Sequence, residues 1–359
     1  MTDFLRDLFS ECTIAVNDGD GSCAINPAPH GPALRNLLTT GLRVRPIQLV
    51  HYASAHFLSR NGFQLTRLGM AFGHLSGALY RNANESLCLR RTGDHEWMGD
   101  VSEVLGVGIA TLAMCRTLPA RFAEISRIDA TGPRCDFEVV TNGLTVIYEA
   151  RGRNSRKRAI AAKAGLPGKK AARPASFKYG LISSLPNDGN PAELFIFDPP
   201  ADDNVNGPTE DEHRLQIARH YTTMAAHAGL HTLAKSLAKR TSEIRASQKW
   251  IAGPLINELP NSRSTISQEG RSFLQDEKAD TDTQWIEDDR PRRLPHRLNP
   301  PSDSKPRLRL EFGLDSRVVD ALRRWDFSQI FDIPLKTHTS FERLIHIAED
   351  GSLLRIVAS

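Results

Sequence analysis

Two β-prone runs joined by an Asn-Gly pair constrain this chain more than any other feature. The runs cover residues 135–141 and 144–151, with Asn142 and Gly143 between them. Asn-Gly between two such runs is the strongest short-range signal for a β-hairpin with a two-residue type I′ turn. The sequence therefore predicts an antiparallel hairpin in the middle of the chain.

The register of that hairpin brings two acidic side chains together. With a two-residue turn, paired residue numbers sum to 285, so Asp136 lies directly opposite Glu149. Directly opposed Cβ atoms are about 5 Å apart, and like charges placed there repel each other. Arg151 lies two residues beyond Glu149 and shares its face of the strand. We therefore expect a carboxylate pair that a cation or a proton holds together.

Such a pair on adjacent strands is suited to metal chemistry. Carboxylate oxygens are hard ligands of the kind that Mg²⁺ or Mn²⁺ prefers. A metal bound there activates water and stabilises charge that develops on a phosphate, and a neighbouring cation can bind that phosphate. The alternative is a solvent-facing hairpin whose acidic side chains are paired with Arg134 and Arg151.

A third carboxylate lies on a predicted helix that covers residues 101–115. This segment is apolar on nearly all faces, which indicates burial, and Glu103 is its only ionisable group before Cys115. A buried carboxylate needs a partner or a metal. Alternatively, Asp100 and Glu103 have the spacing of a helix capping box; the two interpretations are not exclusive.

The net charge of +4 conceals one strongly basic segment. Between Arg151 and Asn187 there are ten Lys and Arg residues and no acid, so the rest of the chain has 36 basic against 42 acidic residues, or −6. This is a candidate footprint for a polyanion, although a solvated basic face is the alternative. The residues expected to hold a nucleic-acid backbone are Arg153, Arg156, Lys157, Arg158, Lys163, Lys169 and Lys170.

Several other classes of protein are excluded or disfavoured. Five scattered cysteines without a CxxC pair argue against a disulfide framework or a zinc ribbon, and they fit a reducing cytoplasm. There is no P-loop and no nucleophile elbow. The longest apolar stretch, Val104 to Met114, is shorter than the roughly 20 residues of a membrane span. His213, His220, His227 and His231 have helical spacings, which favour a packed or solvated stripe over a metal site.

The order of the predicted elements resembles the PD-(D/E)xK nuclease superfamily, over about residues 95–200. A helix with Glu103, the hairpin with Asp136 and Glu149-Ala150-Arg151, a basic helix and two strands follow one another. The resemblance implies an α/β protein with a restriction-endonuclease-like core of helix, β-meander, helix and strands. It also implies a divalent-metal-dependent nuclease acting on DNA, with RNA as the alternative substrate. Asp136, Glu149 and Glu103 would then bind Mg²⁺ or Mn²⁺.

The motif departs from the superfamily at one important position. Arg151 stands where a lysine is usual, and arginine cannot give up its proton at ordinary pH. It can still act in catalysis by binding a phosphate with both arms of its guanidinium. Lys163, in the following helix, is either a replacement for the missing lysine or an exposed helix residue. The competing prediction is an inactive nuclease-fold module that binds nucleic acid or protein.

The rest of the chain divides by composition. The first 40 residues are rich in Gly, Asn, Asp and Pro and read as a loosely structured arm. Seven acids between Asp276 and Asp289, followed by many prolines and basic residues, indicate a linker or a long loop. The predicted divisions are an N-terminal α/β extension (1–94), the nuclease-like core (95–200), a helical region (201–256), the linker (257–307) and a small α+β element (308–359).

Overall fold

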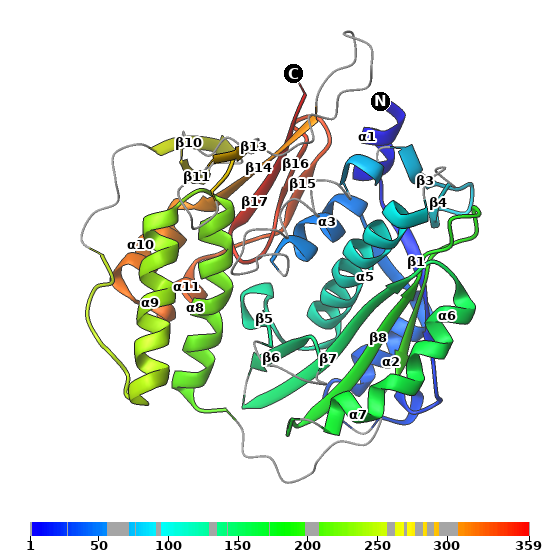
Figure 1. The fold of residues 1–359 in the computed structure, drawn as a ribbon, viewed down its shortest axis with the longest axis horizontal. Helices are drawn as coiled ribbons and strands as arrows, with labels where there is room; N and C mark the ends of the chain where they lie inside the picture. The colour runs from blue at the N-terminus through cyan, green and yellow to red at the C-terminus, as the bar shows by residue number, and fades with distance from the viewer. Residues whose placement is uncertain are drawn as a thin grey trace. The chain divides into compact units, whose positions relative to one another are not determined.

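The predicted hairpin lies next to the edge strand β5 of a seven-stranded sheet in the computed structural model (Figure 1). Strands β6 (Phe137–Thr141) and β7 (Leu144–Arg153) are antiparallel, with Phe137 opposite Tyr148. The register that sums to 285 is therefore confirmed. Gly143 has a φ of 74°, a conformation that glycine adopts readily and that a type I′ turn requires; Asn142 lies outside the described residues.

The chain divides into two compact units, which we describe separately. The first is Met1–Phe57 with Arg67–Thr209, and the second is Leu58–Thr66 with Glu210–Ser359. The structure describes residues 2–26, 28–55, 72–75, 77–90, 95–128, 135–141, 143–171, 173–197, 208–256, 263–268, 271–276, 283–285, 291–293 and 308–358.

The sheet of the first unit is mixed, and its order is β2-β1-β9-β8-β7-β6-β5. Strands β5, β6 and β7 form an antiparallel meander, β8 lies parallel to β7, and β1 lies parallel to β9. The other strands of this unit are β1 (Cys12–Asp18), β2 (Leu42–Val44), β5 (Ile125–Arg127), β8 (Phe177–Ser184), β9 (Glu193–Phe197) and the separate hairpin β3 (Leu79–Arg81) with β4 (Leu87–Leu89).

Helices cover both faces of this sheet. The long helix α5 packs on one face, where Thr111 Oγ1 lies 3.3 Å from Tyr148 Oη of β7, and α2 and α3 lie against α5. The opposite face carries α6, η3 and α7, with Leu166 packed over Gly180 of β8. The bounds are α1 (Thr2–Phe9), η1 (Cys23–Ile25), α2 (Gly31–Thr40), α3 (Pro46–Ser54), α5 (His95–Thr117), η2 (Phe122–Glu124), α6 (Arg156–Ala161), η3 (Ala162–Gly165) and α7 (Leu166–Ala171).

Glycines bring α5 directly onto β7. A Cβ atom on Gly152 of β7 would lie 1.6 Å from the carbonyl oxygen of Ser102, and one on Gly106 would lie 2.4 Å from the Gly152 nitrogen. Neither position can hold a larger residue without moving backbone. This contact fixes the first turns of α5, which carry Glu103, beside the end of β7.

Two predictions for this unit are wrong. The first 40 residues are no loose arm, because Cys12, Ile14 and Val16 of β1 are buried and the strand pairs with β9 in the central sheet. Helix α5 begins at His95 rather than near residue 101. Asp100 therefore lies inside the helix, and the capping-box interpretation of Glu103 fails.

Helix α5 also has the length and composition of a membrane span between Met98 and Thr117, but 78% of its most apolar window is buried inside the protein. It packs as a core helix of the first unit.

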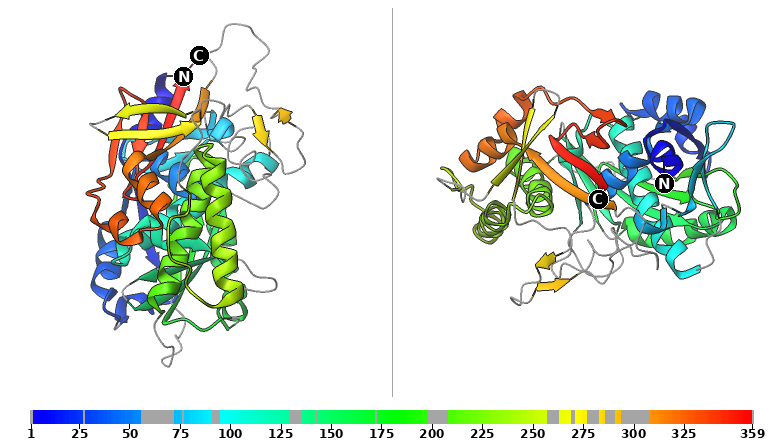
Figure 2. Two further views of the ribbon diagram at one scale, coloured as in Figure 1. Left: turned by 90° about the vertical axis from the view of Figure 1, so that its left-hand side faces the viewer. Right: turned by 90° about the horizontal axis from the view of Figure 1, so that it is seen from above.

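The second unit combines a pair of helices with a six-stranded sheet of order β10-β11-β14-β17-β16-β15. Helices α8 and α9 lie side by side (Figure 2). His220 of α8 lies 2.6 Å from the carboxylate of Asp350, in the turn between β16 and β17, and both side chains are fully buried. The elements are α8 (Glu210–His227), α9 (His231–Ser247), β10 (Arg263–Gln268), β11 (Arg271–Asp276), β12 (Thr283–Trp285), β13 (Pro291–Arg293), β14 (Leu308–Asp315), α10 (Ser316–Arg324), α11 (Phe327–Asp332), β15 (His338–Ser340), β16 (Ile345–Ile347) and β17 (Ser352–Ala358).

Part of the expected linker belongs to this sheet. Strands β10 and β11 pair with each other, and β11 pairs with β14, so the prediction of a linker over 257–307 is wrong for these residues. These strands contain the strand-forming residues Thr265, Ile266, Phe273 and Leu274. The two short strands β12 and β13 also pair, and the remainder of 257–307 lies outside the described residues.

Candidate functional site

The hairpin register brings Asp136, which immediately precedes β6, opposite Glu149 of β7. The backbone nitrogen of Asp136 donates to Tyr148 O at 3.2 Å, which continues the ladder one residue beyond β6. Burial and the charge of Glu149 raise the pKa of Asp136 from 3.8 to about 6. The two carboxyl groups therefore form the close, repelling pair that the register predicts.

The two oxygens of Glu149 have different surroundings. Oε1 accepts hydrogen bonds from Arg151 Nε at 2.6 Å and from Lys169 Nζ at 2.5 Å. Oε2 is buried and accepts no hydrogen bond from an N–H group of the described residues, and Glu149 is only 1% exposed. A hydrogen bond between the carboxyl groups of Glu149 and Asp136 contributes to the raised pKa of Asp136. Two buried carboxyl groups at this distance need a shared proton or a cation between them. These hard oxygen donors fit a divalent cation.

Arg151 lies on the carboxylate face, as the strand alternation predicts. Burial opposes its charge, but the carboxylates of Glu149 and Asp136 outweigh burial and raise the pKa of Arg151. Glu103 also raises the pKa of Arg151, which places its carboxylate within electrostatic range of the cluster. Next on the strand, Arg153 has its pKa lowered by burial and by the charge of Arg151.

The lysine that reaches the carboxylates is Lys169, from α7. Lys163, the expected replacement for the motif lysine, instead lies 3.9 Å from Asp20 and near the ring of Phe197. The reason is geometric. Leu166, the first residue of α7, packs over Gly180, and Gly180 is the residue of β8 paired with Glu149. This packing places α7 beside Glu149. From the sequence, Lys169 was predicted only to contact the backbone of a nucleic acid.

The basic segment separates into buried and exposed cations. Lys170 is 3% exposed and its Nζ donates to the carbonyl oxygens of Lys178 and Phe197, so it is unsuited to the nucleic-acid contact predicted for it. Lys157 and Arg158 of α6 are exposed. Arg156, also exposed, lies 3.5 Å from Glu193 and over the ring of Phe195.

Two further residues near the site were missed from the sequence. Glu138 follows Asp136 by two positions on the same face of β6, is 5% exposed and forms an ion pair with Arg173. Period-two alternation alone would have placed Glu138 on the carboxylate face.

The neighbouring Cys135 is not a nucleophile, because burial and the charge of Glu149 raise its pKa to about 12.

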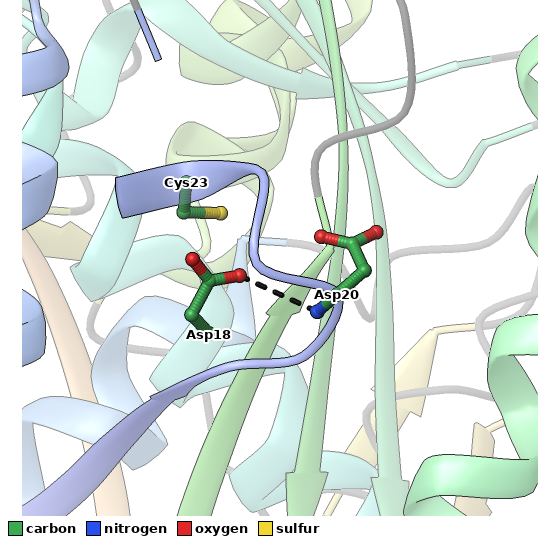
Figure 3. A group of neighbouring side chains, drawn as sticks. All are labelled: Asp18, Asp20 and Cys23. Carbon is green, nitrogen blue, oxygen red and sulfur yellow. Dashed lines mark hydrogen bonds between the residues drawn. The ribbon is translucent and has the colours of Figure 1, made fainter. Parts of the chain in front are cut away.

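The other groups of candidate ligands are structural. His220 is paired with Asp350, while His213 and His227 stack on Phe331 and Phe312, so the helical histidines do not converge on one point. Asp18, Asp20 and Cys23 lie close together in the loop after β1 (Figure 3).

That second cluster serves its own loop. The carboxylate of Asp18 accepts from the backbone nitrogens of Gly21 at 2.8 Å and Ala24 at 2.9 Å. Asp20 accepts from Ser22. Hydrogen bonds of this kind hold a turn and leave the Asp136–Glu149 pair as the better candidate site.

The chain has no significant match among models of known protein families, characterised proteins or solved structures.

Proposed function

We propose that the protein is a divalent-metal-dependent nuclease with a restriction-endonuclease-like core, and that it hydrolyses phosphodiester bonds in DNA. The observation that carries the proposal is the crowded carboxyl pair: Oε2 of Glu149 is buried with no N–H donor among the described residues, and Glu149 helps to raise the pKa of Asp136. Asp136 and Glu149 would bind Mg²⁺ or Mn²⁺, and Glu103 lies within electrostatic range to assist.

The order of elements supports the same proposal. Helix α5 is followed by the meander β5-β6-β7, by the basic segment α6-η3-α7 and then by β8, which is parallel to β7. This order supports the proposal, because the PD-(D/E)xK resemblance implies a helix, a β-meander, a second helix and a further strand.

The residues of the chain then have distinct tasks. A divalent cation held by Asp136 and Glu149 would activate water and stabilise charge on the phosphate. Arg151, with a fixed charge and a forked guanidinium, would bind the non-bridging oxygens of the scissile phosphate. In the hydrolysis as a whole, the hydroxyl of water would go to phosphorus and its proton to the leaving sugar oxygen. The exposed Lys157 and Arg158 of α6 hold the flanking backbone electrostatically.

The proposal is tested by incubating the protein with plasmid DNA, single-stranded DNA and RNA, each with Mn²⁺, with Mg²⁺ or with EDTA. We expect Mn²⁺-dependent cleavage of DNA by the wild type and its loss in Asp136→Asn, because an amide removes one ligand charge. Cleavage of RNA alone would reassign the substrate. Cleavage that persists in Asp136→Asn would show that the site is elsewhere or that a contaminant acts.

The competing proposal is an inactive nuclease-fold module. The substitution that favours it is Arg151 at the position where the superfamily has lysine. In that case the wild type binds DNA without cleaving it at any metal concentration, and Asp136→Asn binds as well or better because a negative charge is removed.

A further inference from the structure

Two cations share a single oxygen of Glu149. Arg151 Nε and Lys169 Nζ lie 2.6 and 2.5 Å from Oε1, while no N–H group in the described part of the chain donates to Oε2. The side chain of Lys169 is 24% exposed and that of Arg151 is 35% exposed. Both cations therefore contact Oε1 of Glu149, and neither contacts Oε2.

The helix that carries Lys169 is held in place, whereas the lysine side chain is partly exposed. The adjacent Lys170 anchors α7 through the carbonyls of Lys178 and Phe197, and Leu166 packs over Gly180. Lysine carries its charge on a flexible four-carbon stem. Rotation of the Lys169 side chain therefore requires no movement of the helix.

We propose that Lys169 holds Glu149 in the metal-free protein and, with a divalent cation on the other carboxylate oxygen, turns to the scissile phosphate. The inference rests on the proposed nuclease function. Like charges at close range disfavour the ammonium and the cation on one carboxylate, and the ammonium of Lys169 is carried on a flexible four-carbon stem. Lys169 would then supply the ammonium group that is missing from β7, where Arg151 stands at the position of the superfamily's lysine.

This role predicts that metal affinity and turnover change in opposite directions. Lys169→Met removes a cation that competes for Glu149, so the Kd for Mn²⁺ should fall three- to tenfold in isothermal titration calorimetry. The same variant should lose about 100-fold or more in kcat for DNA cleavage, the size expected when one charge-stabilising donor is removed. A lysine that only supports the fold would weaken both binding and turnover when removed.

A second variant moves the amine to the strand. Arg151→Lys introduced into Lys169→Met restores a lysine beside Glu149, and we expect it to recover at least tenfold of the lost kcat. Arg151→Met in the same background should recover none. Lys239→Met, at an exposed lysine of α9 that lies 3.9 Å from Glu243, is the control that should leave the Mn²⁺ affinity and kcat unchanged.

The outcomes separate this inference from the function on which it rests. If the wild type cleaves and Asp136→Asn does not, yet Lys169→Met binds Mn²⁺ more weakly or keeps kcat within threefold, the role of Lys169 is refuted and the nuclease stands. If the wild type does not cleave DNA, both proposals fall. Tighter Mn²⁺ binding with reduced kcat in Lys169→Met, together with rescue by Arg151→Lys, supports the role.

Discussion

Among single residues, Asp136 is the one whose ionisation depends most clearly on its neighbours. Its pKa is raised from 3.8 to about 6 by burial and by the charge of Glu149. A carboxyl group with a raised folded-state pKa contributes stability that is complete below pH 3.8 and is lost as the pH rises through 6. At neutral pH the metal-free protein therefore carries an unfavourable charge at this position.

Replacing that charge should stabilise the metal-free protein. We expect Asp136→Asn to gain stability relative to the wild type as the pH rises, by about 1 to 2 kcal/mol between pH 5 and pH 7.5, from a shift of about two pKa units at 1.36 kcal/mol each. Urea unfolding at the two pH values, with EDTA present, measures this difference. An Asn variant that is equally destabilised at both pH values would contradict the pKa assignment.

The pH dependence of metal binding should report the same ionisation of Asp136. Because Asp136 must lose its proton to bind a cation, the Mn²⁺ affinity of the wild type should rise up to tenfold per pH unit below pH 6 and level off above pH 7. Calorimetry in buffers of different ionisation enthalpy reports the released proton directly. Asp136→Asn should lose both the affinity and this pH dependence; an unchanged pH dependence would assign the proton to another group.

Among the elements, the contact between α5 and β7 decides where the site can form. Gly106→Ala places a Cβ 2.4 Å from the Gly152 nitrogen, and we expect it to destabilise the protein by about 3 kcal/mol or more, since overpacking against backbone cannot relax. Gly99→Ala is the matched control in the same helix, where an added Cβ meets nothing within 4 Å. It should stabilise by about 0.5 to 1 kcal/mol through helix propensity. Thermal unfolding distinguishes the two, and similar effects would refute the close contact.

Helix α6 gives the electrostatic test. Lys157→Ala and Arg158→Ala should each weaken DNA binding and reduce the slope of log affinity against log salt by about one. Fluorescence anisotropy at several salt concentrations measures the slope. Lys235→Ala, an exposed lysine of α9, should leave it unchanged, and an equal loss in that variant would indicate binding by general charge.

Local pattern predicted the elements well and their contacts poorly. The Asn-Gly turn fixed the register of β6 and β7, because a two-residue turn allows few alternatives. The start of α5 was placed six residues late, since Gly99 reads as a helix breaker although it faces open space. Lys169 could not be selected over Lys163, because the choice depends on Leu166 packing over Gly180, a contact between residues of different elements.

At the scale of the whole molecule, two compact units with separate cores predict two unfolding transitions. Mn²⁺ should raise the midpoint of only the transition of the first unit, by binding its native state. Asp350→Ala leaves His220 buried without its partner, and it should lower the other midpoint by an amount equivalent to about 3 kcal/mol. Calorimetry follows both transitions, and tryptophan fluorescence reports mainly the second unit, which holds Trp250, Trp285 and Trp325, whereas the first unit holds only Trp97. A single transition that responds to both changes would show one cooperative unit.

The outermost strands of the seven-stranded sheet, β2 and β5, have only three residues each. Each carries an exposed arginine, Arg43 in β2 and Arg127 in β5. Short edge strands with an exposed positive charge pair poorly with a strand from another molecule. A sheet whose interior is rich in Val, Ile, Phe and Tyr is thereby protected from growing sideways into aggregates, and replacing either arginine with valine should lower the concentration at which the protein precipitates.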